Sequence, residues 1–247
     1  MSKIFDGFMS IPQKGRKPLV IYITGYKGGI GKSVTAILTG YLASTTGLKV
    51  IYEDFDSNND DVLQLTKDTD GVGRFIRQRE SWVEHLKRAL DESYDVMIVN
   101  MPAQGEEDMN DHGLSAISRL KQSGRVEVKT IFIISPYKDS VVLLNAYLKR
   151  NSGEPVFVAR QMAQALNEHD FSTYEKYRSN FDLRGGDVFN IPRMPTNLLE
   201  ALLTERKPLA QYIKESQEDI VKAFQAEQAV KGLNELALTL GLENGHE

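Results

Sequence analysis

The chain has 247 residues, a formal net charge of −4 and no cysteine. Its composition, 41% hydrophobic and 26% charged, is typical of a globular protein and excludes collagen-like, disordered and coiled-coil classes. The lack of cysteine excludes disulfide scaffolds, thiol catalysis, cysteine-ligated zinc and iron–sulfur clusters, and the weakly acidic charge lacks the basic excess of a strong nucleic-acid binder.

Short apolar segments alternate along the chain with longer amphipathic stretches. Five segments rich in Val, Ile and aromatic residues predict buried strands, because they are apolar without alternation; they span residues 19–24, 49–53, 95–100, 128–135 and 155–159. Helices are predicted at residues 32–46, 81–90 and 208–240. This order predicts an α/β fold with a mostly parallel twisted sheet flanked by helices and followed by a C-terminal helical tail.

Local signals refine these predictions. Ser81 and Glu84 have capping-box spacing at the start of the second helix, and Gly232 is expected to kink or split the third. Residues 167–186 are polar and irregular, and they give no clear secondary structure. Trp82 and Tyr94 are expected to pack in the core.

We expect one domain over residues 1–247, with an N-terminal extension at residues 1–18 and the helical segment at residues 209–247. Residues 1–18 lack an apolar run of signal-peptide length, and no stretch approaches 18 consecutive apolar residues. A cytoplasmic protein is therefore expected.

The most informative segment is a glycine-rich loop, residues 27–33, between the first predicted strand and the first predicted helix. Glycines allow consecutive backbone N–H groups to turn inward around phosphate oxygens, and the helix N-terminus adds a partial positive charge. Lys32 can reach the β- and γ-phosphates, and the Ser33 hydroxyl can bind Mg²⁺. The loop predicts a triphosphate site, although Tyr26 stands where the usual P-loop has glycine and Lys27 adds a second lysine.

The sequence Lys27-Gly28-Gly29-Ile30-Gly31-Lys32-Ser33 resembles the deviant Walker A motif of the ParA/MinD superfamily of dimeric ATPases. Two further motifs stand at the expected places. Asp54-Phe55-Asp56-Ser57-Asn58 corresponds to the family's D-x-D-P-Q, and Asn100-Met101-Pro102-Ala103 corresponds to D-x-P-[PA]. The resemblance covers residues 19–135, about half the chain. The third motif and the tail look most like plasmid stability and conjugation accessory ATPases of the StbB type.

The resemblance implies a role for each matching residue. Lys27 would reach across a nucleotide-sandwiched homodimer to the partner's phosphates, Lys32 would hold phosphate in its own subunit, and Asp56 would orient the attacking water. Mg²⁺ would be bound by Ser33, with Asp54 near its shell and Asn100 contacting it through water. ATP would be bound along the loop and the helix start, through Gly28, Gly29, Ile30, Gly31, Lys32, Ser33 and Val34, with Pro192 near the adenine.

Departures from the family pattern bear on this site. Asn100 stands where the family has aspartate, so its amide accepts a hydrogen bond but carries no charge, and weaker metal binding and hydrolysis are expected. Arg160 stands where many relatives have an adenine-reading asparagine; it is expected to stack on the base, to pack beside it or to point to solvent. The acidic run at residues 106–108 is either a nucleotide-sensing switch loop or a solvated acidic loop.

The sequence favours a slow, partner-stimulated ATPase that dimerises on ATP–Mg²⁺ and acts in DNA partition, plasmid stability or conjugation. A DNA-bound adaptor or cargo protein is the implied partner. For direct nonspecific DNA binding, the residues to examine are Arg178, Arg184, Arg193 and Arg206. The acidic C-terminus is unlike a basic membrane-targeting helix. The alternatives are a small-molecule ligase or kinase of the dethiobiotin-synthetase type, and a nucleotide-binding module with little hydrolysis.

Overall fold

The computed structural model describes residues 17–56, 61–66, 70–74, 78–91, 94–103, 112–150, 153–227 and 240. Seven strands form one parallel sheet in the order β3-β2-β4-β1-β5-β6-β7. The strands are β1 Leu19–Thr24, β2 Val50–Asp54, β3 Asp70–Gly73, β4 Val96–Asn100, β5 Glu127–Ile134, β6 Val156–Gln161 and β7 Val188–Ile191. The α-helices are α1 Lys32–Thr45, α2 Asp61–Leu65, α3 Arg79–Ala89, α5 Leu114–Ser123, α6 Lys138–Arg150, α7 Ser172–Tyr177, α8 Thr196–Leu203 and α9 Leu209–Ser216.

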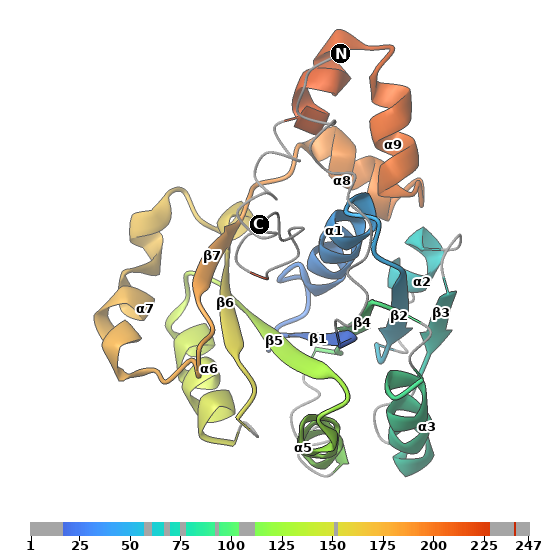
Figure 1. Ribbon diagram of the computed structural model, residues 1–247. Coiled ribbons are helices and arrows are strands. Elements are labelled where there is room, and N and C mark those ends of the chain that lie inside the picture. Colours follow the sequence, from blue (N-terminus) through green and yellow to red (C-terminus); the bar gives the residue numbers. More distant parts are fainter. Residues whose placement is uncertain are drawn as a thin grey trace, which may run out of the picture.

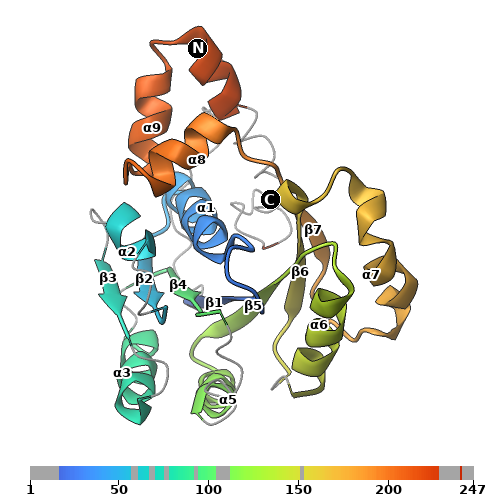
Figure 2. The same ribbon diagram turned by 180° about the vertical axis from the view of Figure 1, so that it is seen from behind.

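Helices cover both faces of the sheet (Figure 1). On one face α1 packs with α2, α8 and α9, and on the other lie α3, α5, α6 and α7, as the view from behind also shows (Figure 2). Each face has its own apolar core, to which the central strands contribute alternate side chains. This two-sided burial explains why the strands are continuous apolar runs.

The five predicted strands are confirmed to within two residues at each end. The central strand β1 is fully buried apart from its last residue, as its unbroken apolar sequence indicates. β3 was not predicted, because its sequence DGVG contains two glycines and one apolar residue. β7 was not predicted either; it ends just before Pro192, the residue that the resemblance places near the adenine.

The predicted capping box of the second helix is wrong. α3 begins at Arg79, after Gln78 as its N-cap, so Ser81 already lies inside the helix. Ser81 is buried there, as are Trp82 and His85, and Trp82 stacks on Phe55 with ring centroids 4.6 Å apart. The core position expected for Trp82 is therefore confirmed.

The long helix predicted at residues 208–240 is also interrupted. α9 ends at Ser216, and a second helical segment starts at Ile220, where Oδ1 of Asp219 accepts the N–H groups of Val221 and Lys222. Asp219 thus caps a new helix where the sequence pattern predicted continuation. The predicted kink at Gly232 lies outside the described residues.

The apolar residues of the helix predicted at residues 208–240 do not all pack. Ile213 packs against the core and Leu240 is buried in it, whereas Ile220 and Phe224 are 87% and 61% exposed. Residues 167–186, expected to be irregular, instead contain α7 and two short 3-10 helices, η3 Glu168–Phe171 and η4 Arg178–Asn180. Phe171 and Tyr174 anchor this segment in the core, a pair of aromatic residues that the surrounding polar sequence conceals.

Among the described residues, no helix is long and apolar enough to cross a membrane. Because every strand is parallel, all carboxyl ends of strands meet at one edge of the sheet. In open α/β sheets this is the edge at which ligands bind.

Candidate functional site

The glycine-rich loop follows β1 at this edge and leads directly into α1. Gly29 and Gly31 have φ values of 74° and 91°, a left-handed backbone that glycine adopts without steric cost. Left-handed residues at alternate positions of a loop turn successive backbone N–H groups toward one point, and such a concavity can bind an anion. α1 begins at Lys32 as predicted, and its N-cap Gly31 offers no side-chain acceptor to the first-turn N–H groups.

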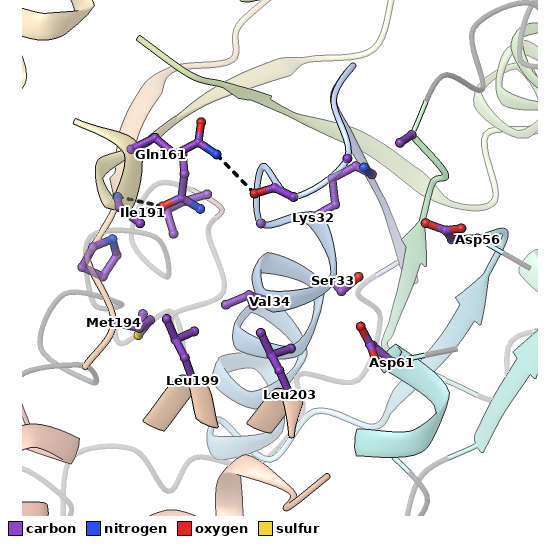
Figure 3. A pocket seen from close by; sticks show the side chains of 17 residues that line it. Lys32, Ser33, Val34, Asp56, Asp61, Gln161, Ile191, Met194, Leu199 and Leu203 are labelled. Atoms are coloured by element: carbon purple, nitrogen blue, oxygen red, sulfur yellow. Dashed lines mark hydrogen bonds between the residues drawn. The ribbon is translucent and has the colours of Figure 1, made fainter. Parts of the chain in front are cut away.

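A cavity of about 650 Å³ opens beside the loop (Figure 3). Its polar part contains the loop glycines, Lys32, Ser33 and two carboxylates, Asp56 and Asp61. Its other part is apolar and comes from the start of α1, the turn after β6, the end of β7 with the segment that follows it, and helix α8. The apolar lining residues are Val34, Ala163, Ile191, Pro192, Met194, Leu199 and Leu203.

Lys32 is buried in the polar part of this cavity, with 6% of the residue exposed. Its Nζ donates to the carbonyl of Lys27 at 3.3 Å. Burial lowers the pKa of the Lys32 ammonium, and the nearby Asp56 carboxylate offsets this only partly. An anion in the cavity would raise this pKa again, because an opposite charge nearby favours the charged ammonium, so the surroundings of Lys32 suit a phosphate group.

The polar groups of the second and third motifs meet beside the loop. Asp54 and Asn100 are paired residues of β2 and β4, and both are buried. Oδ1 of Asp54 accepts from the Asn100 amide at 3.0 Å and from the N–H of Asp56 at 3.0 Å. Asp56, with its carboxylate in the cavity lining, is therefore held in place by the backbone–side-chain bond to Asp54.

Lys27 lies apart from this group. Its side chain is 47% exposed and is not part of the cavity lining. Its Nζ pairs with Oδ2 of Asp139 at 3.5 Å and lies 5.3 Å from the centroid of the Tyr137 ring. The loop's two lysines thus have different surroundings, one buried at the cavity and one on the surface.

The sequence-derived site residues separate into two groups. Gly28, Gly29, Gly31, Lys32, Ser33, Val34, Asp56 and Pro192 line one cavity, with Asp54 and Asn100 directly behind it. Ile30 contributes its carbonyl to a contact beside the cavity, but its buried side chain packs in the core.

Arg160 does not line the cavity. Consecutive strand residues point to opposite faces, so Gln161 reaches the cavity and Arg160 points away from it. The Arg160 guanidinium donates to Asn190 at 2.8 Å and to Glu175 at 3.1 Å, and it lies over the Phe171 ring. The structure thus does not bring Arg160 together with the other predicted site residues, and its guanidinium is engaged within the chain.

The four arginines considered for DNA contact all have acceptors within the chain. Arg178 pairs with Glu175, Arg184 with Asp182, and Arg206 with Asp61, while Arg193 donates to the carbonyl of Ala165. The acidic run at residues 106–108, with Ser57 and Asn58 of the second motif, lies outside the described residues.

Sequence reasoning missed several cavity residues. Gln161 and Gln164 donate to carbonyls of the glycine-rich loop, and Asp61 begins α2 at the cavity wall. The amphipathic sequence TNLLEALL of α8 indicated a helix, but only the fold brings Leu199 and Leu203 beside the loop.

The donor set fits a hard cation. Ser33 and the carboxylates supply oxygen atoms, and Oδ1 of Asn100 is a buried acceptor without a hydrogen-bond partner in the described part of the chain. No cluster of three or more His, Cys, Asp or Glu among those residues could hold a metal by itself. Oxygen donors of this kind would fit Mg²⁺, which keeps several waters and uses few protein ligands together with substrate phosphates.

Comparisons with known proteins agree with this architecture. No family model matches the chain. A relative, protein MobD of Acidithiobacillus ferrooxidans, is 24% identical over 199 residues, which are 79% of this chain and 87% of the relative.

Solved structures show the same fold. The ATP complex of McdA from Cyanothece is 13% identical, with 94% of this chain and all of that chain covered and a TM-score of 0.57. MinD, a cell division protein of Aquifex aeolicus, is 21% identical, with 92% and 98% covered and a TM-score of 0.51. The signal recognition particle receptor FtsY of Elizabethkingia anophelis with GDP has a TM-score of 0.52, but the chain spans only 57% of its length. The chain therefore has the fold of the ParA/MinD-like P-loop NTPases.

Proposed function

We propose that this protein is an ATP-dependent, dimerising molecular-switch ATPase of the ParA type. The observation that carries the proposal is the single cavity that joins the glycine-rich loop, buried Lys32 and Asp56 to an apolar end. A nucleoside triphosphate likewise has a charged end, its phosphates, and a flat, less polar end, its base. The ATP-bound state of the structural neighbour McdA supports adenosine nucleotide as the ligand.

Each polar residue has a chemical task in this proposal. Lys32 and the loop N–H groups neutralise and position the phosphates, which is most of what phosphoryl transfer requires. Asp56 orients the attacking water, and Asp54 fixes Asp56 through the 3.0 Å bond to its N–H. When bound, Mg²⁺ supplies charge neutralisation at the phosphates; Ser33 would hold it, with Asp54 and the free Asn100 acceptor contacting its waters.

The position of Lys27 supports the dimeric part of the proposal. An exposed ammonium outside the chain's own cavity is available to a second subunit that covers the loop. Its partner Asp139 is 72% exposed, and ion pairs between such exposed groups are worth ~0.2–1 kcal/mol, so exchange to a partner's phosphate costs little.

The cellular role that we propose is the positioning of DNA cargo, in partition, plasmid stability or conjugation, through a DNA-bound adaptor that stimulates hydrolysis.

Phosphate release from ATP–Mg²⁺ tests the chemistry, with wild type compared against Asp56→Ala. ATP should still bind the variant while turnover falls by at least about 100-fold, because water positioning contributes 10²–10⁴-fold in such reactions. Asp91→Ala, which removes an exposed carboxylate outside the cavity, serves as the matched control and should leave turnover unchanged. Equal turnover by wild type and Asp56→Ala would contradict the role of Asp56. ATP binding without turnover by wild type would favour the binding module, and turnover only with a metabolite would favour the ligase or kinase.

A further inference from the structure

Gln161, at the end of β6, holds the glycine-rich loop through its side chain. The residue is buried, with 5% exposed. Its Nε2 donates to the carbonyl of Ile30 at 3.2 Å, and its Oε1 accepts the N–H of Ala163 at 3.1 Å. Both ends of the amide are therefore engaged, and the side chain links the loop to the turn after β6.

A second glutamine from the same turn acts on the neighbouring peptide. Residues 162–164 form the short 3-10 helix η2, Met162–Gln164, which brings Gln164 to the loop. Nε2 of Gln164 donates to the carbonyl of Gly29 at 3.2 Å. Two successive carbonyls of the loop are thus held by two glutamines that are three residues apart.

Holding these carbonyls also fixes the N–H groups that would bind an anion. In a planar trans peptide the C=O and the following N–H point in opposite directions. Contacts to the carbonyls of Gly29 and Ile30 therefore turn the N–H groups of Ile30 and Gly31 away from the glutamines. Glycine at position 31 allows this close approach, because its φ is 91° and a Cβ there would lie 2.2 Å from Nε2 of Gln161 and displace the amide.

We propose that Gln161, assisted by Gln164, is a positioning residue that holds the glycine-rich loop in its phosphate-binding conformation before the nucleotide arrives. This inference rests on the proposed nucleotide site. It assigns to the buried amide a task in affinity, because a loop that is already ordered costs less to order on binding. It also means that the Gln161 amide does not read the nucleobase.

The test compares wild type with Gln161→Met, which keeps the length of the side chain and removes both hydrogen bonds. Calorimetric Kd values for ATP–Mg²⁺ and ADP–Mg²⁺ are measured, together with the Tm of the ligand-free protein. Both Kd values should rise about tenfold, since two hydrogen bonds of ordinary net strength are lost. KM should rise by the same factor with kcat within about twofold, because loop positioning acts on ground state and transition state alike.

Two further variants keep the test decisive. Gln122→Met makes the same exchange at an exposed helix position and should behave as wild type. Gln164→Met, at the exposed outer contact, should raise Kd about threefold for its single hydrogen bond, and it serves where Gln161→Met fails to fold.

The possible results distinguish a failure of the role proposed for Gln161 from a failure of the proposed nucleotide-binding function. If wild type binds nucleotide and the Kd of Gln161→Met stays within twofold of wild type, the inference is overturned and the proposed function is not. If Gln161→Met does not fold, the same result in a folded Gln164→Met overturns the inference. A loss of affinity that merely follows a large fall in ligand-free Tm, or a fall in kcat without a rise in KM, also overturns it. A wild-type protein that binds no nucleotide overturns the proposed function and this inference together.

Discussion

Asn100 donates from its side-chain amide to the carboxylate of Asp54, and the two residues are paired neighbours at the carboxyl ends of β4 and β2. The bond is 3.0 Å long and buried. The Asn100 amide therefore both donates and offers an acceptor, which an ionised aspartate at this position cannot do because it has no donor. The amide N–H donates a hydrogen bond to the buried Asp54 carboxylate, and Oδ1 of Asn100 remains a buried acceptor.

Asn100→Asp should destabilise the ligand-free protein at neutral pH. The change replaces a donor by a second carboxylate next to Asp54, and the lost hydrogen bond and like-charge contact should cost ~2 kcal/mol, a fall in Tm of ~4–8 °C for a chain of this size. Thermal unfolding at pH 7 and pH 4 checks this, and the loss should shrink at pH 4, where one carboxyl takes up a proton. ATP–Mg²⁺ should recover more Tm in the variant than in wild type. A ligand-free variant as stable as wild type at pH 7 would refute the account of this pair.

Lys27→Ala should leave the affinity of one subunit for ATP within about threefold of wild type and abolish the ATP-dependent dimer. The reason is that the Lys27 side chain is 47% exposed and lies outside its own cavity. Calorimetry and sedimentation velocity of the same samples measure the two effects. Asp139→Ala is the matched control, since it removes the ion-pair partner but keeps the lysine, and it should still dimerise. An ATP-loaded Lys27→Ala dimer as stable as wild type would exclude the proposed role between subunits.

Leu199→Glu should weaken ATP binding more than tenfold. Leu199 belongs to the apolar wall of the cavity and is half-buried. A nucleobase bound against a carboxylate at this position would remove water from the charge, which costs free energy, so the carboxylate should keep the base out. Fluorescence titration with a labelled nucleotide measures the loss. Ile220→Glu, at an 87% exposed position away from the cavity, should have no effect. Equal affinity of the two variants for the nucleotide would show that the nucleobase does not bind against Leu199.

Glu53→Gln should destabilise the protein most at neutral pH and least in acid. Burial alone would raise the pKa of Glu53, but the hydrogen bonds and charges of His85 and Arg74 outweigh burial and lower this pKa below the usual 4.5. Because the folded-state pKa is depressed, the stabilisation is complete above about pH 4.5 and is lost as the pH falls through the folded-state pKa.

At pH 7 the loss should be ~3 kcal/mol, as for the removal of one partner from a buried ion pair. Arg74 contacts the Glu53 carboxylate at 2.8 Å and His85 contacts its other oxygen. Denaturant unfolding at pH 7 and at about pH 3, well below the usual pKa of 4.5, gives the two differences. Glu84→Gln, which changes an exposed carboxylate paired with Lys87, is the control and should leave the stability unchanged at both pH values. An equal loss at both pH values would exclude the charge of Glu53 as the cause.

The sequence predicts those parts of the molecule that depend on local chemistry. Continuous apolar runs located the central strands, and the glycine-rich loop located the start of α1 at Lys32. Tertiary packing decided what local rules could not. DGVG is a strand because it pairs with β2, and Asp219 divides a helix that the apolar pattern continues.

The same division holds within the site. Lys32, Ser33, Asp54 and Asp56 are recognisable because their spacing reflects phosphate and metal chemistry. Gln161 carries no such signal, since a glutamine at the end of a strand becomes a loop contact only when β6 lies near the loop. The resemblance pointed to Arg160 because it stands where many relatives have asparagine. A one-residue shift along a strand reverses the face, and sequence alone does not fix that register.

The most direct test of the central claim is the molar mass of the protein by size-exclusion chromatography with light scattering, with and without ATP–Mg²⁺, with phosphate release followed on the same sample. The account predicts a monomer of 27.8 kDa without nucleotide and twice that mass with ATP–Mg²⁺, reverting as phosphate is slowly released. A monomer whose mass ATP–Mg²⁺ leaves unchanged would contradict the dimeric switch.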